Sequence, residues 1–212
     1  MSEPLLDTSV RGFLDALASG TPTPGGGSVA ALSAAMAAGL ITMVCDLTIG
    51  RQQYAAFEAE ARELRERAEA LRAELQTLAQ DDIEVFNNLL AAYRLPRTTE
   101  ADAASRRAAI QKVTRQATEV PLQVARAAVA LLPLCTPLAR NGNRNAVSDV
   151  GVAVLLVRAA VPSALLNVET NVAALEDQLF VRQARAQAED LTIGLDEEVA
   201  GALALVREQV AG

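Results

Sequence analysis

A run of seventeen residues without a charged side chain, 29–45, limits the possible folds more than any other feature of this sequence. It consists mainly of Ala, together with Leu and with small residues such as Gly and Ser, and its Ala and Leu favour a helix. A helix that is apolar on every side is surrounded by other helices or by lipid. Ala31, Ala35 and Gly39 fall on one face, where a second helix can approach closely. We predict a central helix from about Gly27 or Ser28 to Leu47.

A membrane-spanning role for this run is the first alternative. Its length is at the lower limit for a spanning helix. Ala, Gly and Ser contribute little to insertion, and no excess of Lys or Arg flanks the run. We therefore expect no membrane insertion.

The remaining sequence also predicts helices. Hydrophobic residues make up 51% of the 212 residues but aromatic residues only 3%, so Ala, Leu and Val dominate. We find no alternation typical of strands. Pro121 is expected to kink one helix, Pro133 and Pro137 to interrupt the chain, and Ser148 to cap a helix that bends at Pro162. The expected helices cover about 5–18, 27–47, 52–93, 100–132, 148–187 and 196–210. The expectation is one all-α domain over residues 1–212, a bundle of long antiparallel helices.

A seven-residue repeat organises the long helix 52–93. Its two series of apolar positions are Leu64, Leu71, Leu78 and Val85, and Ala61, Ala68, Leu75 and Leu89. Asp82 occupies the second series, between Leu75 and Leu89. A carboxylate in an apolar seam is costly unless it is paired, hydrogen-bonded or protonated. Burial raises its pKa toward the range used in acid/base catalysis, so Asp82 is the candidate catalytic residue. The alternative is a structural pair with an Arg or a helix N-terminus.

The segment TPTPGGG before the uncharged run is the second candidate site. It lacks the Lys of a phosphate-binding P-loop and does not follow a strand, as a dinucleotide-binding turn would. Gly25, Gly26 and Gly27, followed by Ser28, leave N–H groups open at the positive end of a helix. An anion or a flat ring could approach there. The alternative is a tight turn packed against another helix.

Composition excludes several functions. The net charge is −7, so no nucleic-acid partner is expected. The chain has no His, which excludes a Ser-His-Asp triad and His-based zinc motifs. We predict no metal and no cofactor. Cys45 and Cys135 are expected to be small buried residues. The N-terminal residues do not resemble a secretory signal, which predicts a cytoplasmic protein.

Two further acids border apolar runs. Asp46 follows the uncharged run, and Asp149 precedes another apolar segment. Together with Asp82 they suggest a cleft for a cationic or proton-transferring ligand. Asp149 could equally be an acid of a first helical turn, which the helix dipole favours.

Five collinear stretches resemble the cyclodeaminase/cyclohydrolase family of folate enzymes. They are PTPGGGSVAALSAAMAAGLITMVCDLTIG, DDIEVF, AYRLP, GNRNAVSDVGVAVLL and ALLNVETN, within about residues 5–179. The resemblance implies an all-α fold, a homodimer and a folate-binding cleft.

The resemblance also implies roles for particular residues. The acid of the family falls on Asp82 and its glycine-rich loop on residues 25–27. A further segment falls on Asn143 and Asp149, which would orient water or hold the pterin edge. Another falls on Arg51 and Tyr54. Arg51 and Arg94 are the candidates for the glutamate tail, since Arg binds carboxylates through a fork.

Three activities follow as expectations. With no formiminotransferase domain ahead of its first helix, the chain resembles the stand-alone members. These convert 5,10-methenyltetrahydrofolate and water to 10-formyltetrahydrofolate. The first alternative is cyclodeamination of 5-formiminotetrahydrofolate with release of ammonia. The second is a non-enzymatic scaffold that pairs through Leu64, Leu71 and Leu78. A scaffold would need neither the three glycines nor an acid in its seam.

Overall fold

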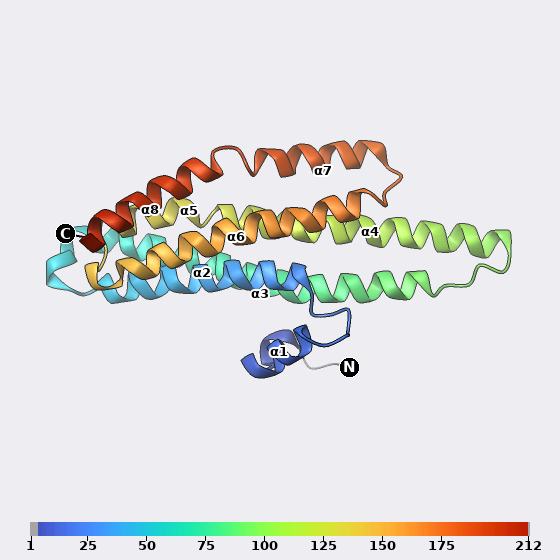
Figure 1. Cartoon of the computed structure of the whole chain (residues 1–212), viewed down its shortest axis with the longest axis horizontal. Helices are drawn as coiled ribbons and strands as arrows, with labels where there is room; N and C mark the ends of the chain where they lie inside the picture. The colour runs from blue at the N-terminus through green and yellow to red at the C-terminus, as the bar shows by residue number, and fades with distance from the viewer. Residues whose placement is uncertain (1–3, 212) are drawn as a thin grey trace.

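The computed structural model describes residues 4–211 and forms an elongated bundle of helices, without a strand in that range (Figure 1). The helices are α1 (Val10–Leu17), α2 (Gly26–Thr48), α3 (Glu58–Tyr93), α4 (Glu100–Val129), α5 (Leu132–Asn141), α6 (Val147–Val172), α7 (Gln178–Asp190) and α8 (Leu195–Ala211). Short 3-10 turns occupy Leu5–Asp7, Gln52–Phe57 and Arg144–Ala146. The predicted all-α fold is confirmed.

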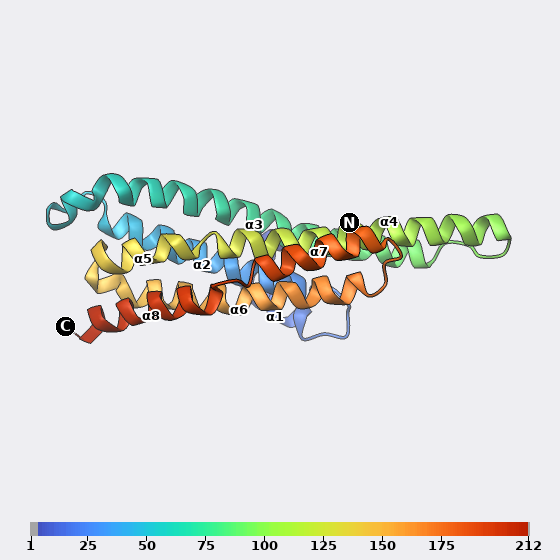
Figure 2. The ribbon, with the colours of Figure 1, turned by 90° about the horizontal axis from the view of Figure 1, so that it is seen from above.

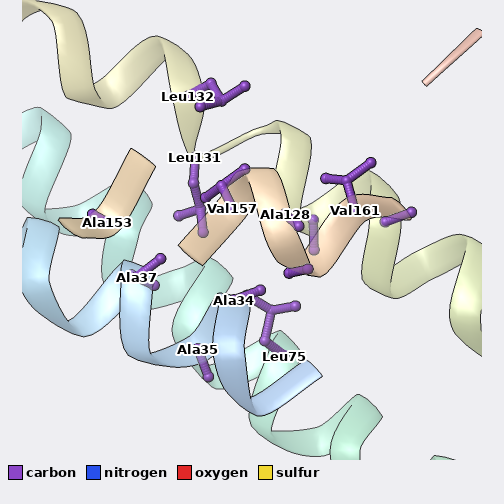
Figure 3. Packing of buried hydrophobic residues seen from close by; sticks show 14 of the residues in the cluster. Ala34, Ala35, Ala37, Leu75, Ala128, Leu131, Leu132, Ala153, Val157 and Val161 are labelled. Atoms are coloured by element: carbon purple, nitrogen blue, oxygen red, sulfur yellow. The ribbon is translucent and has the colours of Figure 1, made fainter. Parts of the chain in front are cut away.

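Helix α2 lies in the centre of the bundle, as its uncharged sequence predicted. It packs most extensively against α3 and α6 and also contacts α4 and α5. Ala34, Ala37 and Ala38 are completely buried. Figure 3 shows Ala34 and Ala37 between Leu75 of α3 and Val157 of α6. Small side chains on α2 therefore bring the larger residues of its neighbours close to its backbone.

Three helical stretches are long and apolar enough to cross a membrane, judged by length and composition alone. They are Gly26–Thr48, Glu100–Asn141 and Arg144–Val172. Between 50% and 61% of the most apolar window in each is buried inside the bundle. Much of their apolar surface thus serves packing within the chain. The expectation that the chain does not enter a membrane stays a prediction.

The heptad leucines of α3 are covered by the chain itself. Leu64, Leu75 and Leu78 are buried, and Leu71 is partly buried against the same core. Helices α2 and α4 both pack along α3. A scaffold that pairs two chains through Leu64, Leu71 and Leu78 is therefore not compatible with this fold.

Several predicted helix limits were wrong. The expected helix 5–18 is divided at Thr8 and Ser9, and Ser9 caps α1. The residue before α6 is Ala146, so Ser148 lies inside that helix and does not cap it. Pro162 lies within a continuous α6, whereas the predicted stretch 148–187 is broken between Val172 and Gln178.

Proline residues are tolerated within several helices. Pro121 lies inside α4 and lacks the N–H that would bond to the carbonyl of Ala117. The Asn171 side chain of α6 donates to that carbonyl at 2.6 Å instead. The helix that Pro133 and Pro137 were expected to interrupt does end at Val129, but Pro133 then lies in the first turn of α5 and Pro137 within it.

Helix α1 lies at the edge of the bundle. Figure 1 shows it beyond α2 and α3, and in Figure 2 it lies toward the same edge as α6 and α8. Phe13 packs against the core and lines a cavity together with Gln80 and Ile83, so α1 is joined to the bundle beside α3. The loop that follows it leads into the three glycines at the start of α2.

Candidate functional site

Asp82 and the start of α2 come together, although 54 residues separate Ser28 from Asp82 in the sequence. Asp82 lies on α3 where this helix passes the amino end of α2. The Ser28 hydroxyl donates a hydrogen bond to Asp82 Oδ2 at 2.9 Å, and the Ser28 side chain is completely buried. The two strongest candidates from the sequence thus form one site. Their juxtaposition could not be deduced from either motif alone.

Gly27 is the residue that allows this approach. A Cβ atom at Gly27 would lie 2.1 Å from Asp82 Oδ1, far inside van der Waals contact. At Gly26 a Cβ would lie 4.0 Å from Asn167 Nδ2, and at Gly25 it would lie 3.5 Å from the Pro22 carbonyl oxygen. Only Gly27 is therefore required by the contact with the carboxylate. Gly25 and Gly26 leave the backbone of the first turn uncovered.

The environment of Asp82 changes its acidity. Burial raises the pKa of the Asp82 carboxyl above its usual value. Hydrogen bonds from the Ser28 hydroxyl and the Ser28 backbone act in the opposite direction. No ion pair within residues 4–211 includes Asp82, so the alternative of a buried pair with an Arg is excluded for that range. The other alternative, a contact with a helix N-terminus, is what the structure has, because Asp82 accepts hydrogen bonds from Ser28 in the first turn of α2. This contact brings no cationic side chain of residues 4–211 to the carboxylate.

Asn167 is a site residue that the sequence analysis did not assign. Its side chain reaches from α6 toward Gly26, and Asn167 Nδ2 donates to the Ser163 carbonyl at 2.9 Å. This bond fixes the amide and leaves its oxygen, an acceptor, for another partner. The signal was present, because Asn167 interrupts the apolar sequence ALLNV. An amide on an apolar stripe is nonetheless ambiguous until the neighbouring helix is known.

A second polar cluster lies at the other end of α2. A cavity of about 610 Å³ is lined by Arg51, Gln52, Gln53, Asn143 and Asn145. The Asn143 backbone N–H donates to Thr48 Oγ1 at 3.0 Å, and its side chain donates to the Leu47 carbonyl at 2.9 Å.

Tyr54 joins this cluster through its hydroxyl, which accepts a hydrogen bond from the Arg144 backbone N–H at 3.2 Å. The chain segments before α3 and before α6 are thus tied to the carboxyl end of α2. Three predicted binding residues, Arg51, Tyr54 and Asn143, therefore lie together.

The two clusters are far apart within one chain. Helix α2 separates them, and its 23 residues span about 33 Å at 1.5 Å per residue. Asp149 lies in the first turn of α6 and is about 27 Å along that helix from Asn167. Arg94 follows the end of α3, about 18 Å beyond Asp82. The predicted site residues therefore do not form one continuous pocket in a single chain.

The acids Asp46 and Asp149 do not share a cleft with Asp82. Asp46 forms an exposed ion pair with Arg65 and lies at the carboxyl end of α2. Asp149 lies in the first turn of α6, as the helix dipole favours. The expectation of one cleft bordered by all three acids was wrong.

Within residues 4–211 no group of three or more acidic or Cys side chains is arranged to hold a metal ion. Cys45 and Cys135 are free and buried, as predicted. Burial raises the pKa of each thiol to about 12, so neither is a thiolate at neutral pH.

Comparison with known proteins gives consistent matches over most of the chain. The sequence model of the family described as "Formiminotransferase-cyclodeaminase" matches residues 9–190. A methenyltetrahydrofolate cyclohydrolase of Methylorubrum extorquens is 43% identical over 183 residues, which is 86% of this chain and 88% of that protein. A formimidoyltransferase-cyclodeaminase of Mus musculus is 38% identical over 83% of this chain, which spans 32% of that longer protein.

A solved structure has the same fold. The crystal structure of a formiminotetrahydrofolate cyclodeaminase from Thermotoga maritima superposes with a TM-score of 0.79 and 29% sequence identity. The match covers 97% of this chain and 96% of that one. The bundle is thus shared almost from end to end.

We predict different effects for the same substitution at two adjacent glycines. Gly27→Ala should lower the free energy of unfolding by about 1–3 kcal/mol, because the methyl group must displace the Asp82 carboxylate. At position 26 there is room for the methyl group, so Gly26→Ala should change the free energy of unfolding by less than about 1 kcal/mol. Urea unfolding of both variants measures the difference. Equal values would mean that Gly27 does not hold the carboxylate at this distance.

Proposed function

Because this chain belongs to the formiminotransferase-cyclodeaminase family, we propose that it hydrolyses 5,10-methenyltetrahydrofolate to 10-formyltetrahydrofolate. The observation that carries the proposal is the half-buried Asp82 carboxylate, which Ser28 holds without a cationic partner in residues 4–211. The match with a cyclohydrolase over 88% of its length supports this choice of reaction.

The substrate supplies the charge that the site lacks. The methenyl bridge between N5 and N10 is a cation, and a carboxylate close to it stabilises the bound state. An Arg or Lys paired with Asp82 would compete with such a substrate. We infer that the missing ion pair is part of how the site selects its ligand.

The reaction needs one group that accepts and returns a proton. The oxygen of a water molecule bonds to the bridging carbon while Asp82 accepts one of its protons. The bond from this carbon to N5 then breaks, and Asp82 returns the proton to N5. The remaining hydroxyl proton leaves as the formyl C=O forms, so one proton is released overall. The Gly25–Gly27 backbone allows the pterin to approach, and Asn167 offers an amide oxygen to hold its edge.

Cyclodeamination of 5-formiminotetrahydrofolate is the second candidate. The likeness to a solved cyclodeaminase over almost the whole chain favours it. Both reactions pass through a tetrahedral carbon between N5 and N10, so one carboxylate can serve either.

The first prediction concerns which reaction dominates. Purified protein should remove the absorbance of 5,10-methenyltetrahydrofolate faster than a weakly catalysing buffer near neutral pH. A parallel assay follows methenyl absorbance and ammonia from 5-formiminotetrahydrofolate. Faster turnover of the formimino compound would assign the cyclodeaminase reaction instead, and no turnover of either would overturn the proposal.

A second prediction concerns the pH profile. Hydrogen bonds from Ser28 favour the ionised form of Asp82, so Ser28→Ala should raise the pKa of this carboxyl further. A base is active only when ionised, so the acidic limb of kcat/KM should move to higher pH. Ser33→Ala is the matched control, because Ser33 lies on α2 and its hydroxyl bonds to the Val29 carbonyl. An unchanged limb in Ser28→Ala would contradict the role of Asp82 as the base.

We further propose that the active form is a homodimer joined through the open face of α2 and α6. Uncharged side chains form one exposed stripe on each helix. The stripe of α2 contains Met36, Met43 and Leu47, and that of α6 contains Val152, Leu155 and Leu166. A contiguous apolar face of this kind is typical of an interface.

The dimer also accounts for the division of the site. The open face runs from the Asp82 cluster at one end to the Arg51 cluster at the other. A twofold axis that crosses these helices would place the first cluster of one chain near the second cluster of its partner. Arg51, Tyr54 and Asn143 would then serve the partner's Asp82, with Arg51 positioned for the glutamate tail. Asp149, in the first turn of α6 just after the Asn143 segment, would lie at the same end as the Arg51 cluster, whereas Arg94, about 18 Å beyond Asp82 along α3, remains the weaker candidate.

Subunit complementation gives a third prediction. Asp82→Asn and Arg51→Glu chains, co-expressed with different affinity tags, form dimers in which one of two sites is intact. Doubly tagged dimers should show about half of wild-type activity, although each variant alone is impaired. If doubly tagged dimers form and show no more activity than the two parents, each chain carries a complete site.

We also propose one domain, a cytoplasmic location and a reaction without a cofactor, a metal, a nucleic acid or a membrane. Adding water to an already electrophilic carbon requires no electron acceptor. The two free cysteines are those expected in a reducing compartment.

A further inference from the structure

Helix α1 is amphipathic, but the bundle covers only part of its apolar side. Val10, Phe13, Leu14 and Leu17 form one stripe. Phe13 and Leu17 are partly buried, whereas Val10 is 78% and Leu14 55% exposed. None of the eight residues of α1 is buried. A helix this short is not stable by itself, so α1 depends on the contacts of Phe13 and Leu17 with the bundle, and its outer stripe is free to meet a partner surface.

The side of α1 that faces the bundle adjoins the loop before Gly25. Phe13 and Ala16 line a cavity of about 280 Å³ together with Pro24 and Ile83, which are neighbours of Gly25 and Asp82. The preceding turn is fixed to α3, because Leu5 is buried and its N–H donates to Gln80 Oε1 at 2.9 Å. The segment is thus anchored at its base and exposed along its outer side.

Most of the exposed large apolar side chains lie on three segments. Fourteen large hydrophobic side chains are exposed within residues 4–211, and nine of them lie on residues 5–17 or on the open stripes of α2 and α6, two helices that pack against each other. Figure 2 shows α1 toward the same edge of the bundle as α6. The outer stripe of α1 and the open face of α2 and α6 would therefore meet one occupant.

We propose that α1 is an arm that packs onto a second copy of this chain, across the dimer interface. This inference rests on the dimer in the proposed function. In an antiparallel pair, the arm, which lies near the amino end of α2, faces the carboxyl end of α2 in the second copy. Val10 and Leu14 then pack near Leu47 and Val152 of that copy, beside its Arg51 cluster.

The interface area supports a contribution from the arm. Helices α2 and α6 lie side by side in antiparallel directions, about 33 Å and about 38 Å long, and at a width of about 10 Å per helix they together present roughly 700 Å². A stable interface of standard size buries about 800 Å² on each partner. The face of α2 and α6 falls somewhat short of this value, and an eight-residue helix about 12 Å long supplies the difference.

The arm can also link dimer formation to the site. Because Phe13 and Ala16 share a cavity with Pro24 and Ile83, a second copy that holds α1 in place also holds the loop before Gly25. Release of the arm should therefore raise KM as well as weaken the dimer.

Photo-crosslinking tests the inference directly. p-Benzoylphenylalanine replaces Leu14 in the full chain, and the protein is irradiated at micromolar concentration. We expect a product of twice the chain mass, with crosslinks near Leu47 and Val152 of the other copy. The same probe at Leu179, an exposed position on α7, should give no such product. Crosslinks confined to one chain in a protein whose native mass is that of a dimer would overturn the arm and leave the dimer.

A second measurement separates the remaining outcomes. Val10→Asp combined with Leu14→Asp should raise the Kd of the dimer at least tenfold, while Leu179→Asp leaves it unchanged. A wild-type chain that is monomeric and fully active would overturn both the arm and the dimer. Sedimentation with vesicles of neutral and anionic phospholipids is the counter-test. Binding that requires Val10 and Leu14, without crosslinks between copies, would assign the stripe to a lipid surface and overturn the proposal.

Discussion

The contact between the Asp82 carboxylate and the first turn of α2 is the interaction on which the rest of the structure depends. It requires a glycine at position 27, since any side chain would occupy the place of Oδ1. It also requires that Ser28 be buried with its hydroxyl directed at Asp82. A carboxylate this close to a helix N-terminus is favoured by the dipole, while burial resists its charge. The result is an acid that is ionised less readily than usual and forms no ion pair within residues 4–211.

The small side chains of α2 also help to bring Asp82 to the first turn of this helix. Ala34, Ala37 and Ala38 let α3 and α6 approach on two sides, and this proximity brings Asp82 and Asn167 to the glycines. The third side of α2 stays open and apolar. Because the polar cluster around Arg51 lies at the far end of this open side, one chain holds two partial sites. Pairing of two chains is the simplest way to complete them.

Much of this could be predicted from the sequence, for identifiable reasons. A helix without charged side chains is stable in water only when other helices cover it, so the sequence predicted that α2 lies in the centre of the bundle. An acid in a leucine seam and three consecutive glycines both cost stability, which marked Asp82 and Gly25–Gly27 as candidates. The resemblance to a family of folate enzymes then predicted that these motifs serve one activity, and the matching relatives support this interpretation.

What could not be predicted depends on contacts between distant segments. Pro121 suggested a kink, but Asn171 from α6 satisfies the carbonyl that the proline leaves free. Asn167 acquires a role only because α6 passes Gly26. The family motifs gave residues for one site without indicating that a helix of about 33 Å separates them. Spacing along a sequence does not show whether two motifs meet within a chain or between chains.

Turnover of 5,10-methenyltetrahydrofolate by Asp82→Asn tests the central claim most directly. Asn has the same shape and can still accept the Ser28 hydrogen bond, but it cannot accept a proton from water. The variant should fold and assemble like the wild type, as judged by circular dichroism and native mass. Its kcat should fall by about 10²-fold or more. A folded variant that retained full turnover would contradict the assignment of Asp82 as the group that moves the proton.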